Sequence, residues 1–100
     1  MSRAKDIVER ASAAGIVIAT AESCTGGMIS AAITDVAGSS QILDRGFVTY
    51  SNAAKMDMLG VSADTLDTHG AVSELVAAEM AAGALQHSNA TLTVSVTGIA

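Results

Sequence analysis

The segment AESCTGG, residues 21–27, brings three candidate nucleophiles together between two apolar runs. The hydroxyls of Ser23 and Thr25 and the thiol of Cys24 could each attack a carbonyl carbon once a base removes the proton. Neither histidine of the chain falls in a loop that would meet this segment, so a Ser-His-Asp triad has little support. The chemistry that these residue types favour is acyl transfer or anion binding at a turn of small residues.

Lysine can replace histidine as the base in such a site. If Lys55 lies beside Ser23 in a partly desolvated pocket, burial lowers its pKa and the neutral amine accepts the serine proton. The Tyr50 hydroxyl would then relay or orient that proton. Cys24 is the rival nucleophile, because a helix N-terminus favours its thiolate. The residues alone rank Ser23 and Cys24 evenly, and each residue taken singly is more often explained by capping, packing or solvation.

The same turn is a plausible anion cradle. Ser23 precedes a predicted helix whose unpaired N–H groups could hold an oxyanion or a phosphate. Gly26 and Gly27 let a ligand approach the backbone, although the P-loop pattern GxxxxGK[ST] is absent and two adjacent glycines are a weak signal. The single cysteine and the two distant histidines show no disulfide framework and no metal-ligand spacing. We therefore expect neither a metal nor a cofactor.

The elements that must position these side chains alternate between helix and strand. Apolar periodicity and capping residues predict helices over residues 1–15, 28–36, 51–59 and 73–87, one helical turn over 62–69, and strands over 16–20, 46–50 and 91–97. The last strand alternates polar and apolar residues, which predicts one buried face and one face that is wet or lines a cleft. Parallel strands need crossover helices, so the order indicates an α/β fold with helix, sheet and helix layers and a mainly parallel sheet.

Ligands of open α/β sheets bind beyond the carboxyl ends of the strands. That rule groups three loops, residues 22–27, 50–55 and 97–100, and the first two contain the candidate serine, tyrosine and lysine.

Length and composition limit the function classes. A chain of 100 residues, half of them apolar, suits one domain over 1–100. The net charge is -5 and the five basic residues form no extended positive stripe, so nucleic acid is not expected as a direct partner. No apolar run approaches the roughly 20 residues that cross a bilayer, and the start of the chain does not read as a secretion signal. The sequence thus predicts a cytoplasmic protein without a membrane partner.

Several motifs occur together in one order, and their combination is more specific than any of them alone. They closely resemble the CinA C-terminal domain family, the competence/damage-inducible proteins that include nicotinamide mononucleotide deamidases. The likeness covers the chain from about residue 5 onward. The motifs are AESCTGG (21–27), ITDVAGSS (33–40), GFVTYSNAAK (46–55), LGV (59–61), HGAVSE (69–74) and VTGIA (96–100).

The resemblance assigns roles to individual residues. It makes Ser23 the nucleophile and the pair Tyr50 and Lys55 the proton-handling groups, which decides against Cys24. The residues expected to bind the nucleotide are Thr25, Gly26, Gly27, Ser39, Ser40, Asn52 and Thr97.

The function that the resemblance implies is a bacterial amidohydrolase of pyridine nucleotide recycling. It would convert nicotinamide mononucleotide and water into nicotinic acid mononucleotide and ammonia through a serine acyl-enzyme, without a metal. The alternative is a nucleotide-binding or interaction domain without turnover, and a thiol-dependent hydrolase using Cys24 is a third option.

Members of this family continue past the GIA segment. The amidase domain over 1–100 is therefore expected to lack its C-terminal part and to expose its last strand, with instability or association unless the sequence is only part of the natural chain. A homo-oligomer is expected as well.

Overall fold

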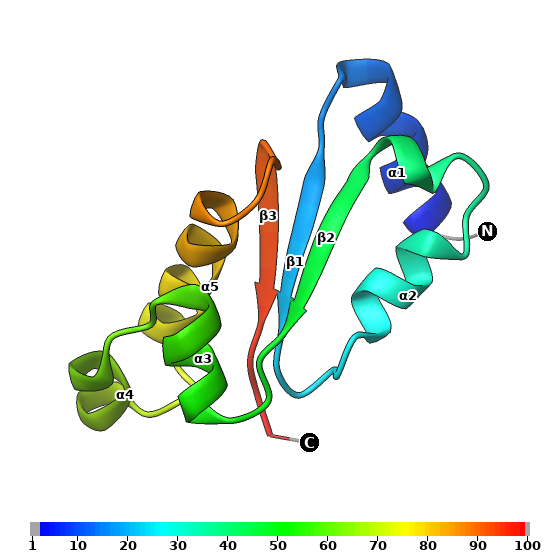
Figure 1. Cartoon of the computed structure of the whole chain (residues 1–100). Helices are drawn as coiled ribbons and strands as arrows, with labels where there is room; N and C mark the ends of the chain where they lie inside the picture. Colours follow the sequence, from blue (N-terminus) through cyan, green and yellow to red (C-terminus); the bar gives the residue numbers. More distant parts are fainter. Residues whose placement is uncertain (1–2, 100) are drawn as a thin grey trace.

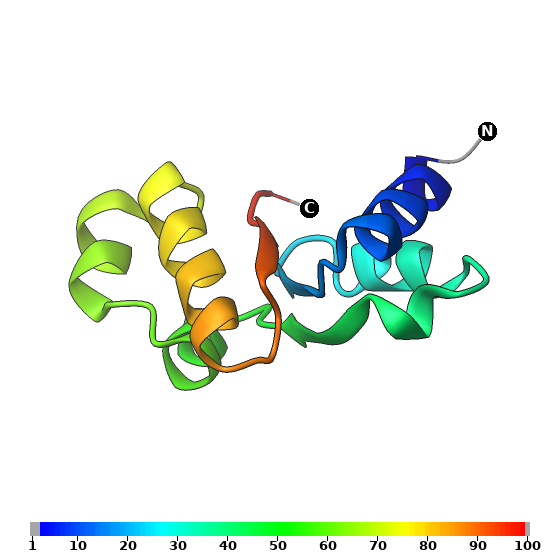
Figure 2. The ribbon, with the colours of Figure 1, turned by 90° about the horizontal axis from the view of Figure 1, so that it is seen from above.

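The computed structural model describes residues 3–99 and confirms a layered α/β fold (Figure 1). Its elements are α1 (Arg3–Ala14), β1 (Ile18–Glu22), α2 (Met28–Thr34), the 3-10 turn η1 (Ser39–Gln41), β2 (Leu43–Val48), α3 (Asn52–Leu59), α4 (Ala63–His69), α5 (Glu74–Gln86) and β3 (Leu92–Val96). The three strands form one parallel sheet in the order β2-β1-β3. Figure 2 shows α1 and α2 on one side of the sheet and α3, α4 and α5 on the other. The predicted first helix and last loop include residues 1, 2 and 100, which lie outside the described residues.

The first and last residues of the strands differ from the predicted ones, because pairing with neighbouring strands decides where a strand begins and ends. β1 ends at Glu22, beyond the predicted end, since Glu22 pairs with Val48 of β2 and Val96 of β3. β2 begins before the predicted start, at Leu43, which pairs with Ile18. β1 is thus the central strand and is buried along its whole length, as expected of a strand covered on both faces.

The helix ends are confirmed where local chemistry sets them. The hydroxyls of Ser51 and Ser73 accept the N–H groups of Ala54 and Val76, which caps α3 and α5. Gly60 ends α3 with a φ of 68°, a left-handed conformation that favours glycine. Within residues 3–99 no helix combines the length and the apolar content that a bilayer crossing requires.

The hydrophobic core is divided by the sheet. One cluster fills the space between the sheet and the helices α3, α4 and α5, and the other lies between the sheet and the helices α1 and α2. The buried members of the first are Ala21, Leu59, Val61, Leu66, Val76, Met80 and Ala84. Those of the second are Val8, Ala11, Ile18, Ile33 and Ile42.

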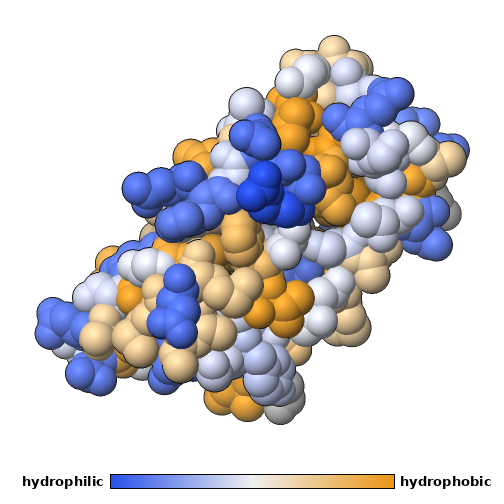
Figure 3. Space-filling view, in the orientation of Figure 1, coloured by the Kyte–Doolittle hydropathy of each residue, from blue (hydrophilic) through white to orange (hydrophobic). Residues whose placement is uncertain are grey.

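In β3 the polar side chains pack against a helix, while apolar side chains are exposed. Its polar side chains face α5, where Thr93 and Ser95 donate hydrogen bonds to main-chain carbonyls at 2.8 and 2.6 Å. Its apolar side chains Leu92 and Val94 remain 47% and 43% exposed. Small residues of α5 let the helix come close enough for the hydroxyls to reach its backbone. Apolar residues also reach the surface in the view of Figure 3, where hydrophobic areas lie between hydrophilic ones.

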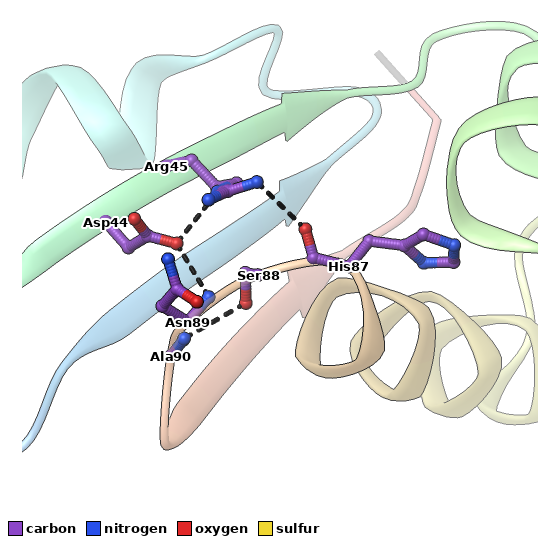
Figure 4. Close-up of polar contacts among 6 residues, drawn as sticks. All are labelled: Asp44, Arg45, His87, Ser88, Asn89 and Ala90. Carbon is purple, nitrogen blue, oxygen red and sulfur yellow. Dashed lines mark hydrogen bonds and ion pairs between the residues drawn. The ribbon is translucent and has the colours of Figure 1, made fainter.

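A polar cluster joins the amino ends of the strands (Figure 4). The Asp44 carboxylate of β2 accepts hydrogen bonds from Arg45 Nε at 2.8 Å and from the Asn89 amide at 2.9 Å. Arg45 also donates to the main-chain carbonyl of His87 at 3.0 Å. These contacts connect β2 with the segment between α5 and β3, on the far side of β1.

Candidate active site

Ser23 and Lys55 form a buried pair at the carboxyl end of the central strand. Ser23 follows β1 directly and is 5% exposed, while Lys55 of α3 is 2% exposed. Lys55 Nζ lies 3.0 Å from Ser23 Oγ and donates to the main-chain carbonyls of Thr49 at 3.1 Å and Tyr50 at 3.4 Å. Burial lowers the pKa of Lys55, and only the neighbouring Cys24 acts in the opposite direction.

The fold explains why two residues so far apart in sequence meet. The Ser23 amide donates to the carbonyl of Val96 at 2.9 Å, which continues the pairing of β1 with β3 past the end of the strand. Lys55 lies one turn into α3, and helical side chains lean toward the N-terminus of their helix. Its amine therefore points back to the carboxyl end of β2, where Thr49 and Tyr50 present their carbonyls.

Tyr50 enters the site through its backbone, which differs from the predicted role of its hydroxyl. The side chain is 65% exposed, and among residues 3–99 its hydroxyl has no hydrogen-bond partner. The reason is local: Tyr50 lies beyond the last residue of β2, just before the Ser51 cap of α3, so its side chain points outward. Only its carbonyl contacts Lys55.

The turn after Ser23 is organised by a carboxylate that the sequence reading did not single out. Glu22 is fully buried, and its Oε1 accepts hydrogen bonds from Thr25 Oγ1 at 2.6 Å and the Ile29 amide at 2.9 Å. Its Oε2 accepts the Ser30 amide at 2.9 Å. The predicted use of the α2 N–H groups for an oxyanion is thus wrong for Ile29 and Ser30, because Glu22 already occupies both.

Other amides of the turn stay available. Within the described part of the chain no group accepts the N–H of Cys24, Thr25 or Gly27. Gly26 and Gly27 have φ values of 59° and 108°, which glycine adopts without strain. The turn therefore offers unpaired donors directly after the serine, at a position where the backbone is open to a ligand.

The remaining predicted residues fall in two places. Asn52 begins α3 next to the site and is exposed. Thr97 follows β3, donates to the carbonyl of Ala71 at 2.8 Å and lines a hollow of about 350 Å³. Ser39 and Ser40 belong to η1, which precedes β2. Parallel strands begin at one edge of the sheet and end at the other, so the structure does not bring these two serines to Ser23.

Two further residues support the pair without having been predicted. Glu22 could have been noticed as an acidic residue at the end of an apolar strand, three positions before a threonine. Thr49 supplies a carbonyl to Lys55, and its own buried hydroxyl has no hydrogen-bond partner in the described residues. No pattern in the sequence pointed to Thr49.

Cys24 is half-buried next to the pair, and the chain after β3 passes close to it. A Cβ built on Gly98 would lie 3.3 Å from Cys24 Sγ, which is tighter than most such contacts. In the described residues no three histidine, cysteine, aspartate or glutamate side chains are grouped as a metal site. The geometry brings together a hydroxyl and an amine, those of Ser23 and Lys55.

Comparison with known proteins gives one consistent result. The family model of the CinA C-terminal domain matches residues 1–100. A nicotinamide-nucleotide amidohydrolase PncC from Enterobacter agglomerans is 61% identical over 88 residues, which are 88% of this chain and 54% of that protein. The protein of the same name from Escherichia coli is 52% identical over 100 residues, which are 100% of this chain and 61% of that protein.

Solved structures agree with these relatives. The crystal structure of competence/damage inducible protein CihA from Agrobacterium tumefaciens has a TM-score of 0.94 and 55% sequence identity, and the match covers 96% of this chain and 58% of that one. The chain thus spans 54%, 61% and 58% of the length of these three proteins.

Proposed function

Because the chain belongs to the CinA C-terminal domain family, we propose that it is an amidohydrolase domain acting on the carboxamide of nicotinamide mononucleotide. The products are nicotinic acid mononucleotide and ammonia. The observation that carries the proposal is the buried contact of 3.0 Å between Lys55 Nζ and Ser23 Oγ. Relatives named nicotinamide-nucleotide amidohydrolase support the substrate class.

The surroundings of Lys55 suit a base. A neutral amine has two N–H donors and one lone pair, and Lys55 has two carbonyl acceptors and one hydroxyl neighbour. With both N–H groups donated to Thr49 and Tyr50, the lone pair is left for the proton of Ser23. The lowered pKa of Lys55, caused mainly by burial, increases the fraction of this neutral form.

The reaction then proceeds as acyl transfer. Lys55 takes the proton from Ser23 Oγ as the oxygen forms a bond to the carboxamide carbon. Unpaired turn amides, those of Cys24, Thr25 and Gly27, donate to the oxyanion that develops. The C–N bond breaks, and the Lys55 proton leaves with ammonia.

Water completes the cycle. Lys55 accepts a proton from water as the water oxygen attacks the acyl carbon, and the proton returns to Ser23 when the ester bond breaks. The positive charge of the pyridinium ring makes the carbonyl carbon more electrophilic in the amide and in the acyl-enzyme. This charge assists the attack of Ser23 in the first step and of water in the second.

Ammonia release from nicotinamide mononucleotide tests the proposal. We expect Ser23→Ala to lower kcat by about a thousandfold or more, as removal of a nucleophile does elsewhere. Cys24→Ala, the neighbouring control, should retain kcat within about threefold, since the thiol is not the attacking group. Equal rates for the wild type and Ser23→Ala would sink the proposal.

The same assay separates the alternatives. Loss of activity in Cys24→Ala but not in Ser23→Ala would indicate a thiol-dependent hydrolase. Calorimetry that detects tight nucleotide binding while no ammonia forms would favour a binding module without turnover.

A further inference from the structure

We infer that Glu22 is a positioning residue, whose carboxylate holds the turn that carries Ser23 in the shape in which the serine faces Lys55 and the turn amides stay unpaired. The inference rests on the proposed function for its catalytic consequence. Its structural part, that Glu22 fixes this turn, stands on contacts within the described residues.

The Glu22 carboxylate is buried, and among residues 3–99 its partners are hydrogen-bond donors and not a cation. It is 0% exposed and accepts one hydroxyl and two amides, from Thr25, Ile29 and Ser30. Burial by itself would raise the pKa of Glu22, but these hydrogen bonds lower it on balance, so the group is an anion at neutral pH. An ionised acceptor forms stronger hydrogen bonds than a neutral one.

These contacts decide which donors a substrate can use. The Ile29 and Ser30 amides belong to the first turn of α2, and both donate to Glu22. The positive end of this short helix is therefore satisfied within the protein. What remains for a ligand is the set of amides in the turn itself, immediately after the nucleophile.

Glu22 also connects the turn with the segment after β2 that contacts Lys55. Its carbonyl accepts the Thr49 amide at 2.8 Å, and the Thr49 carbonyl accepts Lys55 Nζ at 3.1 Å. The main chain of Glu22 thus fixes the lysine side of the pair, and its side chain fixes the serine side. A shift of the turn by about 1 Å would separate the two reacting atoms, and such shifts cost roughly a hundredfold in rate.

The simpler explanation is that Glu22 only caps a helix, and the chain offers a control for it. Glu79 is half-buried and also binds the start of a helix, α4, with Oε1 accepting the Ser62 amide at 2.8 Å and Oε2 accepting Thr65 Oγ1 at 2.6 Å. Glu79 and the groups it caps lie outside the three loops that form the site. If Glu22 has only a structural role, the loss of either carboxylate lowers stability and leaves kcat unchanged.

The test compares Glu22→Gln with Glu79→Gln in the full chain. Glutamine keeps the size of the side chain but replaces an acceptor oxygen with an N–H donor that opposes a backbone N–H. Both variants should melt at a lower temperature. We expect Glu22→Gln to lower kcat for ammonia release by about 10- to 100-fold with KM changed less than threefold, while Glu79→Gln keeps kcat within twofold.

NMR titration of the Lys55 side chain gives a readout that needs no turnover. We expect its pKa to move toward the ordinary value in Glu22→Gln, because a displaced turn admits water, and to stay unchanged in Glu79→Gln. Unchanged turn amide shifts and an unchanged Lys55 titration in folded Glu22→Gln would overturn the inference. A wild type that releases no ammonia refutes the proposed function instead, and the titration then decides the inference alone.

A milder variant covers the case in which Glu22→Gln does not fold. Thr25→Val keeps the shape of the side chain and removes one of the three donors to Glu22. We expect a smaller fall in kcat and a smaller shift of the Lys55 titration in the same directions. Wild-type kcat together with a wild-type titration would overturn the inference here as well.

Discussion

At the scale of single residues, Lys55 is the most unusual group of the structure. A lysine that is 2% exposed loses nearly all of its hydration, and its amine contacts two carbonyls and a hydroxyl rather than a carboxylate. Retaining a charge in such a place is unfavourable, so burial lowers the pKa below the ordinary value of 10.5. The burial that destabilises the charged form of Lys55 also supplies the neutral amine that can act as a base.

The lowered pKa of Lys55 predicts how the free energy of unfolding depends on pH. Between the lowered pKa of folded Lys55 and 10.5 the unfolded chain binds more protons, so stability rises with pH across this window. Below the folded pKa both states are protonated and the slope from this group vanishes. Chemical unfolding of the wild type and Lys55→Met at several pH values measures the difference. Parallel pH curves for the two proteins would contradict the lowered pKa.

The sequence alone predicts some of the site residues but not all of their roles. Ser23 and Lys55 were predicted as a pair, and the structure brings them into contact. The sequence does not show that Tyr50 contacts Lys55 through its carbonyl or that the Glu22 side chain binds the turn, because both depend on which atoms face the site. A motif identifies which residues lie near a site. Whether the side chain or the carbonyl of such a residue faces the site depends on where the strand ends and the helix begins.

At the scale of elements, α5 approaches α3 more closely than most side chains would allow. A Cβ on Gly83 would overlap the main-chain carbonyl of Leu59. Glycine in the middle of a helix is otherwise unfavourable by about 1 kcal/mol relative to alanine. Its presence here therefore reflects the packing of the two helices and not the propensity of α5.

The contact reverses the usual effect of adding a methyl group to a helix. We expect Gly83→Ala to destabilise the protein by about 1–3 kcal/mol, because the carbonyl of Leu59 can only move with the end of α3. The control Ala82→Gly, at an exposed position of α5, should cost no more than about 1 kcal/mol. Denaturant unfolding of both variants provides the comparison. A Gly83→Ala variant as stable as the wild type would show that the helices separate freely.

Prediction at this scale succeeded where local chemistry decides. Serine caps and Gly60 set the helix ends as predicted, since capping needs only neighbouring residues. The strand limits and the position of Ser39 and Ser40 depend on partners far along the chain. The alternation along β3 predicted one buried face and one face that is wet or lines a cleft, but the structure reverses the expected assignment: the polar face packs against the small residues of α5, and Leu92 and Val94 are exposed.

At the scale of the whole molecule, the sheet is narrow and its edge strand β3 is partly exposed. The molecule measures 40 × 26 × 18 Å, with helices on both sides of three strands. Within residues 3–99, β3 pairs with β1 along one edge only. The exposed side chains of Leu92 and Val94 lie on this strand, next to an unpaired edge that can associate with other chains.

This surface predicts self-association that depends on protein concentration. We expect the double variant Leu92→Gln and Val94→Gln to bind less of a hydrophobic dye and to sediment as a smaller species. Leu75→Gln, at a half-exposed position of α5, serves as the control and should associate like the wild type. Sedimentation velocity over a range of concentrations gives the answer, and identical profiles for the two variants would count against a role of this strand.

The exposed phenol of Tyr50 has one more consequence. The chain contains no tryptophan and no second tyrosine, so its tyrosine emission comes from a single ring, attached to the residue whose carbonyl contacts Lys55. The protein therefore carries an optical probe at the edge of its own site. A change in tyrosine emission on adding a nucleotide, corrected for the absorbance of the nucleotide, would report on that site without a label.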